Sequence, residues 1–310
     1  MNGFNLLRKW KRRLVTHLIT HQMWPPPGHF YSPLVDYRQL GQQAESLFDR
    51  RRASFPGIEL NEAAQCSLLM KMAQFYNEQP FPEDKSGHSR YYLRNGYYSY
   101  ADGLMLHMMM RQFQPKRIIE IGSGFSSALM LDTNERFFEN RIDLTFVEPN
   151  PERLYSLMKP DDESRVTVVT KLVQDIDSSC FSELAAGDML FIDSSHVSKT
   201  GGDVNHLYLE VLPLLNPGVL VQIHDVFEGF EYPKEWVCSD QSYFGFNEMY
   251  LLRAFLMFND AFEIVMFTPW MEQHHREWFE LRMPLFLKDT GGNIWIRRKE
   301  QPSFVKALLA

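Results

Sequence analysis

The sequence has no excess of basic charge and no long apolar run, and each absence excludes a class of protein. Its 310 residues carry a formal net charge of -7, and the isoelectric point is near 5.8. Nucleic-acid-binding domains usually present a basic patch or stripe. A membrane-spanning helix needs roughly 18 or more consecutive apolar residues, and no stretch approaches that length. We therefore expect neither a nucleic-acid-binding protein nor a membrane-spanning one.

Cysteine is also scarce, with three residues at positions 66, 180 and 238. They lack metal-ligand spacing and fit reduced thiols. The basic amphipathic segment at residues 4–15 has no apolar run or cleavage site of a signal peptide. These features predict a cytoplasmic protein. A peripheral membrane contact through residues 4–15 is the less favoured alternative to a solvated or packed terminal helix.

Hydrophobic residues make up 45% of the chain, which is enough for a sizeable core. We expect a helical or irregular cap over residues 1–95, with a Pro-Pro-Pro break at 25–27, and an α/β domain over 96–310. Strands and helices alternate in the second part, which predicts a doubly wound, seven-stranded, mostly parallel sheet with an antiparallel last strand. The expected strands are 117–121, 144–147, 166–170, 189–192, 219–223, 263–267 and 293–297, and helices are expected at 58–78, 100–113, 126–138, from 151, 203–215 and 248–258.

A glycine turn directly follows the first expected strand of this sheet. The segment 117–127 reads Arg-Ile-Ile-Glu-Ile-Gly-Ser-Gly-Phe-Ser-Ser, with Glu120 just before the first glycine. Gly122 and Gly124 allow a tight turn and a close approach of the backbone to a ligand. The turn predicts a site for a nucleotide-like cofactor.

The neighbouring residues decide which cofactor is favoured. A nicotinamide fingerprint needs a third glycine where Ser127 stands, so that fingerprint is incomplete. A second acid, Glu148, ends the next strand, and a carboxylate there can accept two hydrogen bonds from a ribose diol. With Glu120 before the glycine turn, this pattern resembles the class I S-adenosylmethionine-dependent methyltransferases, although Ser126 replaces their frequent third glycine.

The resemblance covers about residues 95–300 and implies a cofactor site. The strings Phe-Ile-Asp-Ser-Ser-His and Val-Gln-Ile-His-Asp look like a bacterial branch of the family. In the family, the first acid faces the methionine end of the cofactor and the second binds the ribose. A contact of Asp175 with adenine is plausible by its place after the third strand, and a plain turn is the alternative. The implied cofactor-binding residues are Glu120, Gly122, Ser123, Gly124, Ser126, Glu148, Asp175 and Asp193.

Four polar side chains follow the fourth and fifth strands. Asp193 and His196 follow one, and His224 and Asp225 follow the other. Adjacent strands lie about 4.8 Å apart, so these side chains should converge beside the cofactor's methyl group. We predict that the reaction takes place there.

Two functional interpretations of this cluster remain open. In one, Asp193, His224 and Asp225 bind a divalent metal such as magnesium, as in metal-dependent O-methyltransferases that the pattern resembles, although histidine is an unusual magnesium ligand. In the other, His196 or His224 is a general base whose tautomer is set by Asp193 or Asp225. A purely structural role, with these groups capping helices or loops, is the third option.

We therefore predict methyl transfer from S-adenosylmethionine to a small molecule, at a hydroxyl oxygen. A non-catalytic cofactor-binding or scaffold protein and a nicotinamide-dependent oxidoreductase are the alternatives. The aromatic segments at 226–236 and 243–248 are expected to wall the acceptor site or to pack on the N-terminal region. Asn95, Tyr98 and Asp102 either close over the methionine part of the cofactor or act as structural caps.

Overall fold

The structure is a computed structural model that describes residues 25–48, 53–238 and 245–300. In this part of the chain, seven strands form one sheet in the order β3-β2-β1-β4-β5-β7-β6. β7 pairs antiparallel with both β5 and β6, and the pairs among β1 to β5 are parallel. This confirms the predicted mostly parallel sheet. The strands are β1 (Arg117–Ile121), β2 (Asp143–Val147), β3 (Thr167–Val169), β4 (Met189–Ile192), β5 (Leu220–His224), β6 (Phe262–Phe267) and β7 (Asn293–Arg298).

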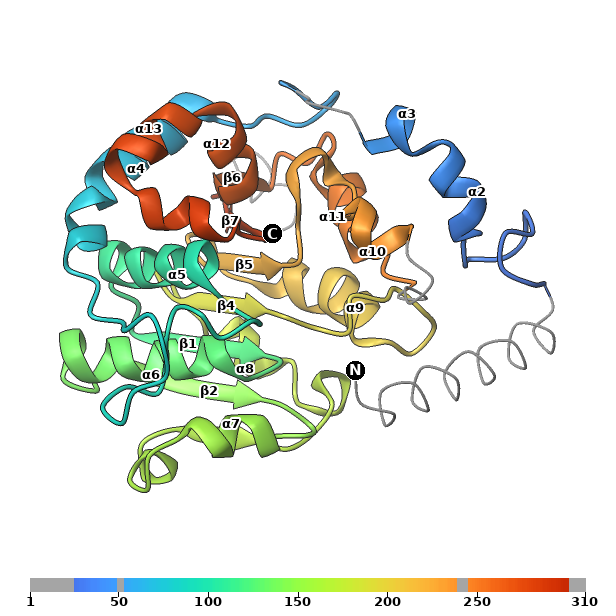
Figure 1. The fold of residues 1–310 in the computed structure, drawn as a ribbon. Coiled ribbons are helices and arrows are strands. Elements are labelled where there is room, and N and C mark those ends of the chain that lie inside the picture. Colours follow the sequence, from blue (N-terminus) through green and yellow to red (C-terminus); the bar gives the residue numbers. More distant parts are fainter. Residues whose placement is uncertain (1–24, 49–52, 239–244, 301–310) are drawn as a thin grey trace, which may run out of the picture. The chain divides into compact units, whose positions relative to one another are not determined.

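The central strands are short apolar runs because helices cover both faces of the sheet. All four residues of β4 and all five of β5 are buried. The parallel register pairs Glu120 with Phe191, and Ile192 with Ile223. β1, β4 and β5 therefore end at the same edge, where the arrows of Figure 1 also end. Whatever follows these strands is brought together at that edge.

The helices of the sheet-containing part agree with most of the predicted ranges. They are α4 (Glu62–Asn77), α5 (Tyr100–Phe113), α6 (Phe125–Phe138), α7 (Glu152–Leu157), α8 (Ser179–Ser182), α9 (Asp203–His206), α11 (Glu248–Leu256), α12 (Thr268–His274) and α13 (Arg276–Arg282). Short turns of other helix types are η1 (Asp162–Ser164), η2 (Val173–Asp175), η3 (Leu207–Val211), η4 (Leu212–Leu214), η5 (Glu228–Phe230) and η6 (Pro284–Lys288).

One connection differs from the predicted one. The helix expected over 203–215 is divided into α9, a π-helical turn η3 and a 3₁₀ turn η4. Pro213 lies in η4, and its missing N–H prevents a regular α-helix there. The last two strands are antiparallel as predicted, and α12, α13 and η6 lie between them.

The chain divides into two compact units. One comprises residues 1–51 and 232–246, and the other residues 52–231 and 247–310. In their described parts, the smaller unit holds α2 (Tyr37–Gln42), α3 (Ala44–Phe48) and α10 (Lys234–Val237). Residues 53–95 group with the sheet, so this division differs from the predicted boundary at residue 95. None of the described helices is long and apolar enough to cross a membrane, and residues 4–15 lie outside the described ranges.

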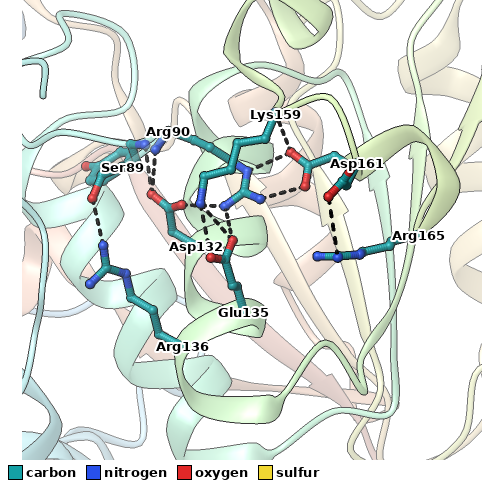
Figure 2. A network of polar contacts seen from close by, with 10 residues as sticks. Ser89, Arg90, Asp132, Glu135, Arg136, Lys159, Asp161 and Arg165 are labelled. Carbon is teal, nitrogen blue, oxygen red and sulfur yellow. Dashed lines mark hydrogen bonds and ion pairs between the residues drawn. The ribbon is translucent and has the colours of Figure 1, made fainter. Parts of the chain in front are cut away.

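A buried arginine attaches the segment before α5 to the sheet-containing unit (Figure 2). The Arg90 guanidinium donates to both carboxylate oxygens of Asp162, at 2.7 and 2.6 Å. It also donates to Asp132 at 2.7 Å and to Glu135 at 2.6 Å, both on α6. Arg90, Asp132 and Asp162 have side chains that are at most 2% exposed. Such a network cannot lose its cation without leaving buried carboxylates uncompensated.

We predict that Arg90→Ala lowers the free energy of unfolding by about 3–5 kcal/mol, because two buried carboxylates lose their partner. Arg94→Ala is a matched control. Arg94 also pairs with both oxygens of one carboxylate, that of Asp84, but these side chains are 61% and 68% exposed. Its loss should cost about 1 kcal/mol or less. Urea denaturation followed by circular dichroism measures both, and equal losses would contradict the role of Arg90.

Candidate active site

The turn after β1 depends on one glycine more than on the other. Gly122 has a φ of +80°, and a Cβ there would lie 1.8 Å from the carbonyl oxygen of Asp193. Gly124 has a φ of 176°, which is extended backbone, and a Cβ there would meet the flexible Arg153 side chain first, at 3.2 Å. The close approach that Gly122 permits is therefore made to the end of β4. The approach of the turn to a ligand stays a prediction.

Glu120 is fully buried at the end of β1. It accepts a hydrogen bond from the Ser127 hydroxyl, and Ser127 Oγ in turn accepts one from Gly124 N at 2.9 Å. Burial raises the pKa of Glu120 to about 8, against the opposite effect of the hydroxyls of Ser126 and Ser127. Ser127, which breaks the nicotinamide fingerprint, thus connects the turn to the first acid.

Glu148 is half-buried after β2 and holds the same turn from the other side. Its Oε2 accepts a hydrogen bond from Ser123 N at 3.1 Å, and its Oε1 accepts one from Asn150 N at 2.7 Å. A carboxylate offers about four lone-pair sites, so these two bonds leave capacity for a diol. Asp175 lies in the turn η2 after β3 and is exposed. Its contact with adenine stays a prediction.

The four polar residues predicted for the reaction converge at the ends of β4 and β5. His196 is central among them. Its Nε2 lies 3.2 Å from Asp193 Oδ1 and 3.2 Å from Asp225 Oδ2. Its Nδ1 lies 2.9 Å from Glu248 Oε2, on α11. Each ring nitrogen of His196 therefore faces at least one carboxylate.

His224 lies beside this group at the end of β5. Its Nε2 is 3.3 Å from Asp102 Oδ2, on α5. Its Nδ1 is 3.5 Å from Asp193 Oδ1 and 3.6 Å from Asp225 Oδ1. These two distances are beyond a hydrogen bond, and Nδ1 has no hydrogen-bond partner among the described residues.

Carboxylates outnumber imidazoles in this cluster, and this controls its ionisation. Although burial opposes the charged form, the facing carboxylates raise the pKa of His196 to about 10 and raise that of His224 well above its usual value. Burial also opposes ionisation of Asp193, yet the two imidazoles lower its pKa below the usual range. Burial raises the pKa of Asp225. The facing carboxylates thus favour the cationic form of both histidines.

The predicted metal site at Asp193, His224 and Asp225 is not supported by this arrangement. In the described ranges, no group of three or more His, Cys, Asp or Glu side chains is placed to hold a metal ion. The chemistry of the donors gives the reason. Both carboxylates already face the His196 cation, whereas Mg²⁺ needs several oxygen ligands.

Two members of the site were not predicted to take part in the reaction. Glu248 begins α11, and its sequence context shows only an acid in the first turn of a helix. Asp102 was predicted either to cover the cofactor or to cap a helix, but its carboxylate contacts His224. Sequence signals for both were weak, because their proximity depends on how α5 and α11 pack against the sheet.

The sequence left two roles open for Asn95 and Tyr98, which were to cover the methionine part of the cofactor or to act as structural caps. The Asn95 side chain forms hydrogen bonds with the backbone of residues 92, 97 and 98, which indicates a structural role. The Tyr98 ring is buried, with its centroid 5.1 Å from that of His224. Its hydroxyl has no hydrogen-bond partner among the described residues. Tyr98 therefore belongs to the wall of the site.

The structure describes part of the aromatic segments that were predicted to wall the acceptor site. Residues 239–244 lie outside the described ranges, and residues 232–246 belong to the smaller unit. Within that unit, the rings of Tyr232 and Trp236 each contact Phe246, with centroids 6.0 and 6.3 Å away. Their role toward the acceptor stays a prediction.

Comparisons with known proteins identify the kind of domain that carries this site. A family model described as a methyltransferase domain matches residues 119–226. An uncharacterized protein of Archaeoglobus fulgidus is 32% identical over 165 residues, which are 51% of this chain and 73% of that protein. Residues 119–226 therefore form a class I S-adenosylmethionine-dependent methyltransferase domain.

Solved structures that match this methyltransferase include two O-methyltransferases. One is TomG from Streptomyces achromogenes, involved in tomaymycin synthesis and crystallised with S-adenosylmethionine; identity is 17%, coverage 85% of this chain and 97% of that chain, and the TM-score 0.42. The other is from Bacillus cereus, in complex with S-adenosylhomocysteine. Its sequence identity is 13%, the match covers 85% of this chain and 98% of that chain, and the TM-score is 0.41. At such scores neither protein informs the acceptor of this chain.

The turn after β1 yields a prediction on its two glycines. Gly122→Ala should destabilise the protein by at least about 2 kcal/mol, because an alanine is strained at positive φ and its Cβ meets the Asp193 carbonyl. Gly124→Ala should cost clearly less, since the Arg153 side chain can move. Thermal unfolding and calorimetry with S-adenosylhomocysteine measure both variants. A Gly122→Ala protein as stable as Gly124→Ala would show that the strand ends can separate.

Proposed function

We propose that this methyltransferase transfers the methyl group of S-adenosylmethionine to a hydroxyl oxygen of a small molecule. The observation that carries the proposal is the contact between the cofactor turn and the reacting cluster. Gly122 lies against the backbone of Asp193, whose side chain contacts His196. A cofactor seated on the turn would thus present its methyl group to the histidines and carboxylates.

The cofactor would be held by the residues around the turn. Glu120 would bind the ammonium group of the methionine part, and Glu148 the ribose hydroxyls. Ser123, Gly124 and Ser126 would line the turn, Asp175 would contact adenine and Asp193 would face the sulfonium. Support comes from the burial of Glu120 beside the turn and from the remaining acceptor capacity of Glu148.

Methyl transfer is an in-line displacement on an activated donor. A bond forms between the acceptor oxygen and the methyl carbon, the bond from sulfur to that carbon breaks, and neutral S-adenosylhomocysteine leaves. Positioning alone can contribute roughly 7–11 kcal/mol. The hydroxyl proton must also go to a base, because an alkylated oxygen that keeps its proton is a poor product.

His224 is the better candidate for that base. Both ring nitrogens of His196 face carboxylates within 3.2 Å, so His196 acts as a fixed cation that holds the acids in place. His224 Nδ1 has no hydrogen-bond partner among the described residues. A sulfonium bound nearby disfavours a further cation beside that of His196, so binding of the cofactor would favour release of the extra proton of His224 and prepare Nδ1 to accept another.

The charge of the cluster limits the acceptor. Asp102, Asp193, Asp225 and Glu248 surround two imidazoles, so a carboxylate or phosphate on the acceptor would meet net negative charge. Like charges repel strongly at partly desolvated sites. We therefore favour a neutral or cationic hydroxyl compound.

The proposal is tested on a panel of small hydroxyl compounds with isotopically labelled S-adenosylmethionine. Label recovered on an acceptor oxygen is the expected result, and an added chelator should leave the rate unchanged. Calorimetry that detects tight NADH binding and no response to S-adenosylhomocysteine would contradict the assignment of S-adenosylmethionine as the cofactor. Cofactor binding without transfer to any acceptor would favour the non-catalytic alternative.

A first prediction concerns Glu120 and protons. Because burial raises its pKa to about 8, Glu120 is largely protonated at pH 7, and a cationic ammonium should displace that proton. Binding of S-adenosylhomocysteine should release close to one proton, measured by calorimetry in two buffers of different ionisation heat. Glu120→Gln should abolish the release and weaken binding roughly 10- to 100-fold. Ser126→Ala keeps the carboxyl and should keep the release; equal release by Glu120→Gln would contradict this role.

A second prediction concerns the base. His224→Ala should lower the rate of methyl transfer by roughly 10²–10⁴-fold, because the proton acceptor is removed, while S-adenosylhomocysteine still binds. His275→Ala is the control, since His275 pairs with Glu62 outside the cluster at 2.9 Å, and its rate should stay near that of the wild type. An unchanged rate in His224→Ala would assign the base elsewhere.

A further inference from the structure

One carboxylate joins two neighbouring strands beneath the reacting cluster. His224 on β5 and Asn293 on β7 are direct cross-strand partners. Asp102 on α5 contacts both: its Oδ2 lies 3.3 Å from His224 Nε2, and its Oδ1 accepts a 2.6 Å hydrogen bond from Asn293 Nδ2. Gly292 N donates to the same Oδ1 at 2.9 Å. Asp102 therefore has one oxygen occupied by two donors and one directed to His224.

The amide of Asn293 has only one favourable orientation. The Thr268 hydroxyl donates to Asn293 Oδ1 at 2.7 Å, and both residues are fully buried. If the amide were reversed, its oxygen would face the carboxylate of Asp102, and two acceptors would oppose each other. Thr268 and Asp102 together thus fix which end of the amide points toward α5.

This arrangement distinguishes the two nitrogens of His224. A carboxylate in the ionised form accepts hydrogen bonds only, so the Asp102 oxygen that faces Nε2 favours a proton on that nitrogen. A neutral imidazole with a proton on Nε2 has its lone pair on Nδ1. Nδ1 is the nitrogen that faces the side of Asp193 and Asp225.

We propose that Asn293, oriented by Thr268, is a positioning residue that keeps the proton of His224 on Nε2 and leaves Nδ1 as the proton acceptor in methyl transfer. Its catalytic part rests on the proposed function, whereas the tautomer of His224 is a property of the protein alone. Asp102, Thr268 and Asn293 all lie outside residues 119–226, so they are contributed by the flanking parts of the chain.

The test is nitrogen NMR of the histidine rings in the full chain with bound S-adenosylmethionine and no acceptor, assigned with His224→Gln. As the pH is raised, Nδ1 of His224 should lose its proton while Nε2 keeps it. Asn293→Ala should give a mixture of tautomers, lower kcat roughly 10- to 100-fold and leave KM for S-adenosylmethionine nearly unchanged. Loss of the proton from Nε2 in the wild type, or wild-type titration in Asn293→Ala, would overturn the proposal.

Matched variants separate positioning from general loosening. Thr268→Val removes the hydroxyl and should shift His224 in the same direction, and Thr268→Ser should restore the wild-type signals. Asn134→Ala removes another buried asparagine, which bonds to both backbone groups of Ile142 at 2.9 and 3.0 Å. It should lower stability without changing the tautomer. The same tautomer mixture in Asn134→Ala would overturn the proposal, whereas absence of methyl transfer in the wild type would overturn the proposed function and leave the NMR result to decide this inference.

Discussion

The close packing of the ends of β1 and β4 is the constraint on which the site depends. Backbone hydrogen bonds join Gly122 N to Val147 O at 2.9 Å and Asp193 N to Ile121 O at 2.8 Å. Three strand ends are thereby held together at the turn. A residue with a Cβ at position 122 would push the Asp193 carbonyl away, and with it one of the carboxylates that hold His196. The geometry of the cofactor turn and that of the reacting cluster are therefore not independent.

The cluster itself is an electrostatic compromise. Burying carboxylates is costly unless cations compensate them, and here two imidazoles compensate four acids only in part. A positively charged donor would supply part of what is missing, and in the proposed reaction that charge disappears when the methyl group leaves. The product would then bind less favourably to the cluster than the donor, which helps product release.

Strand ends were predictable from the sequence, and contacts across layers were not. Apolar runs such as that of β1 are buried on both faces, so their bounds and the polar residues that follow them could be identified. His196 and His224 follow two such strands that are neighbours in the sheet, so their convergence could be predicted. Asn293 could not be assigned in the same way, because its place opposite His224 depends on the antiparallel register of β7. Glu248 likewise depends on the docking of a helix.

A second limit of the sequence patterns concerns roles. Gly122 was recognised, but its close neighbour is the backbone of the same sheet, which no local pattern reveals. The helix over 203–215 was predicted from the overall periodicity of the segment, which gave little weight to Pro213. In the structure this helix is interrupted, and Pro213 lacks a backbone donor there. The predicted metal site relied on residue types alone, whereas in the structure the carboxylates of Asp193 and Asp225 face His196.

The Arg90 network shows that the site around His224 needs residues upstream of the first strand. It anchors the stretch that carries Tyr98 and Asp102, and both reach His224 from upstream of the sheet's first strand. A fragment limited to residues 119–226 would retain the glycine turn but lose the partners that distinguish the two nitrogens of His224. Exchange of the flanking segments between relatives would thus alter reactivity while leaving the nucleotide-binding half intact.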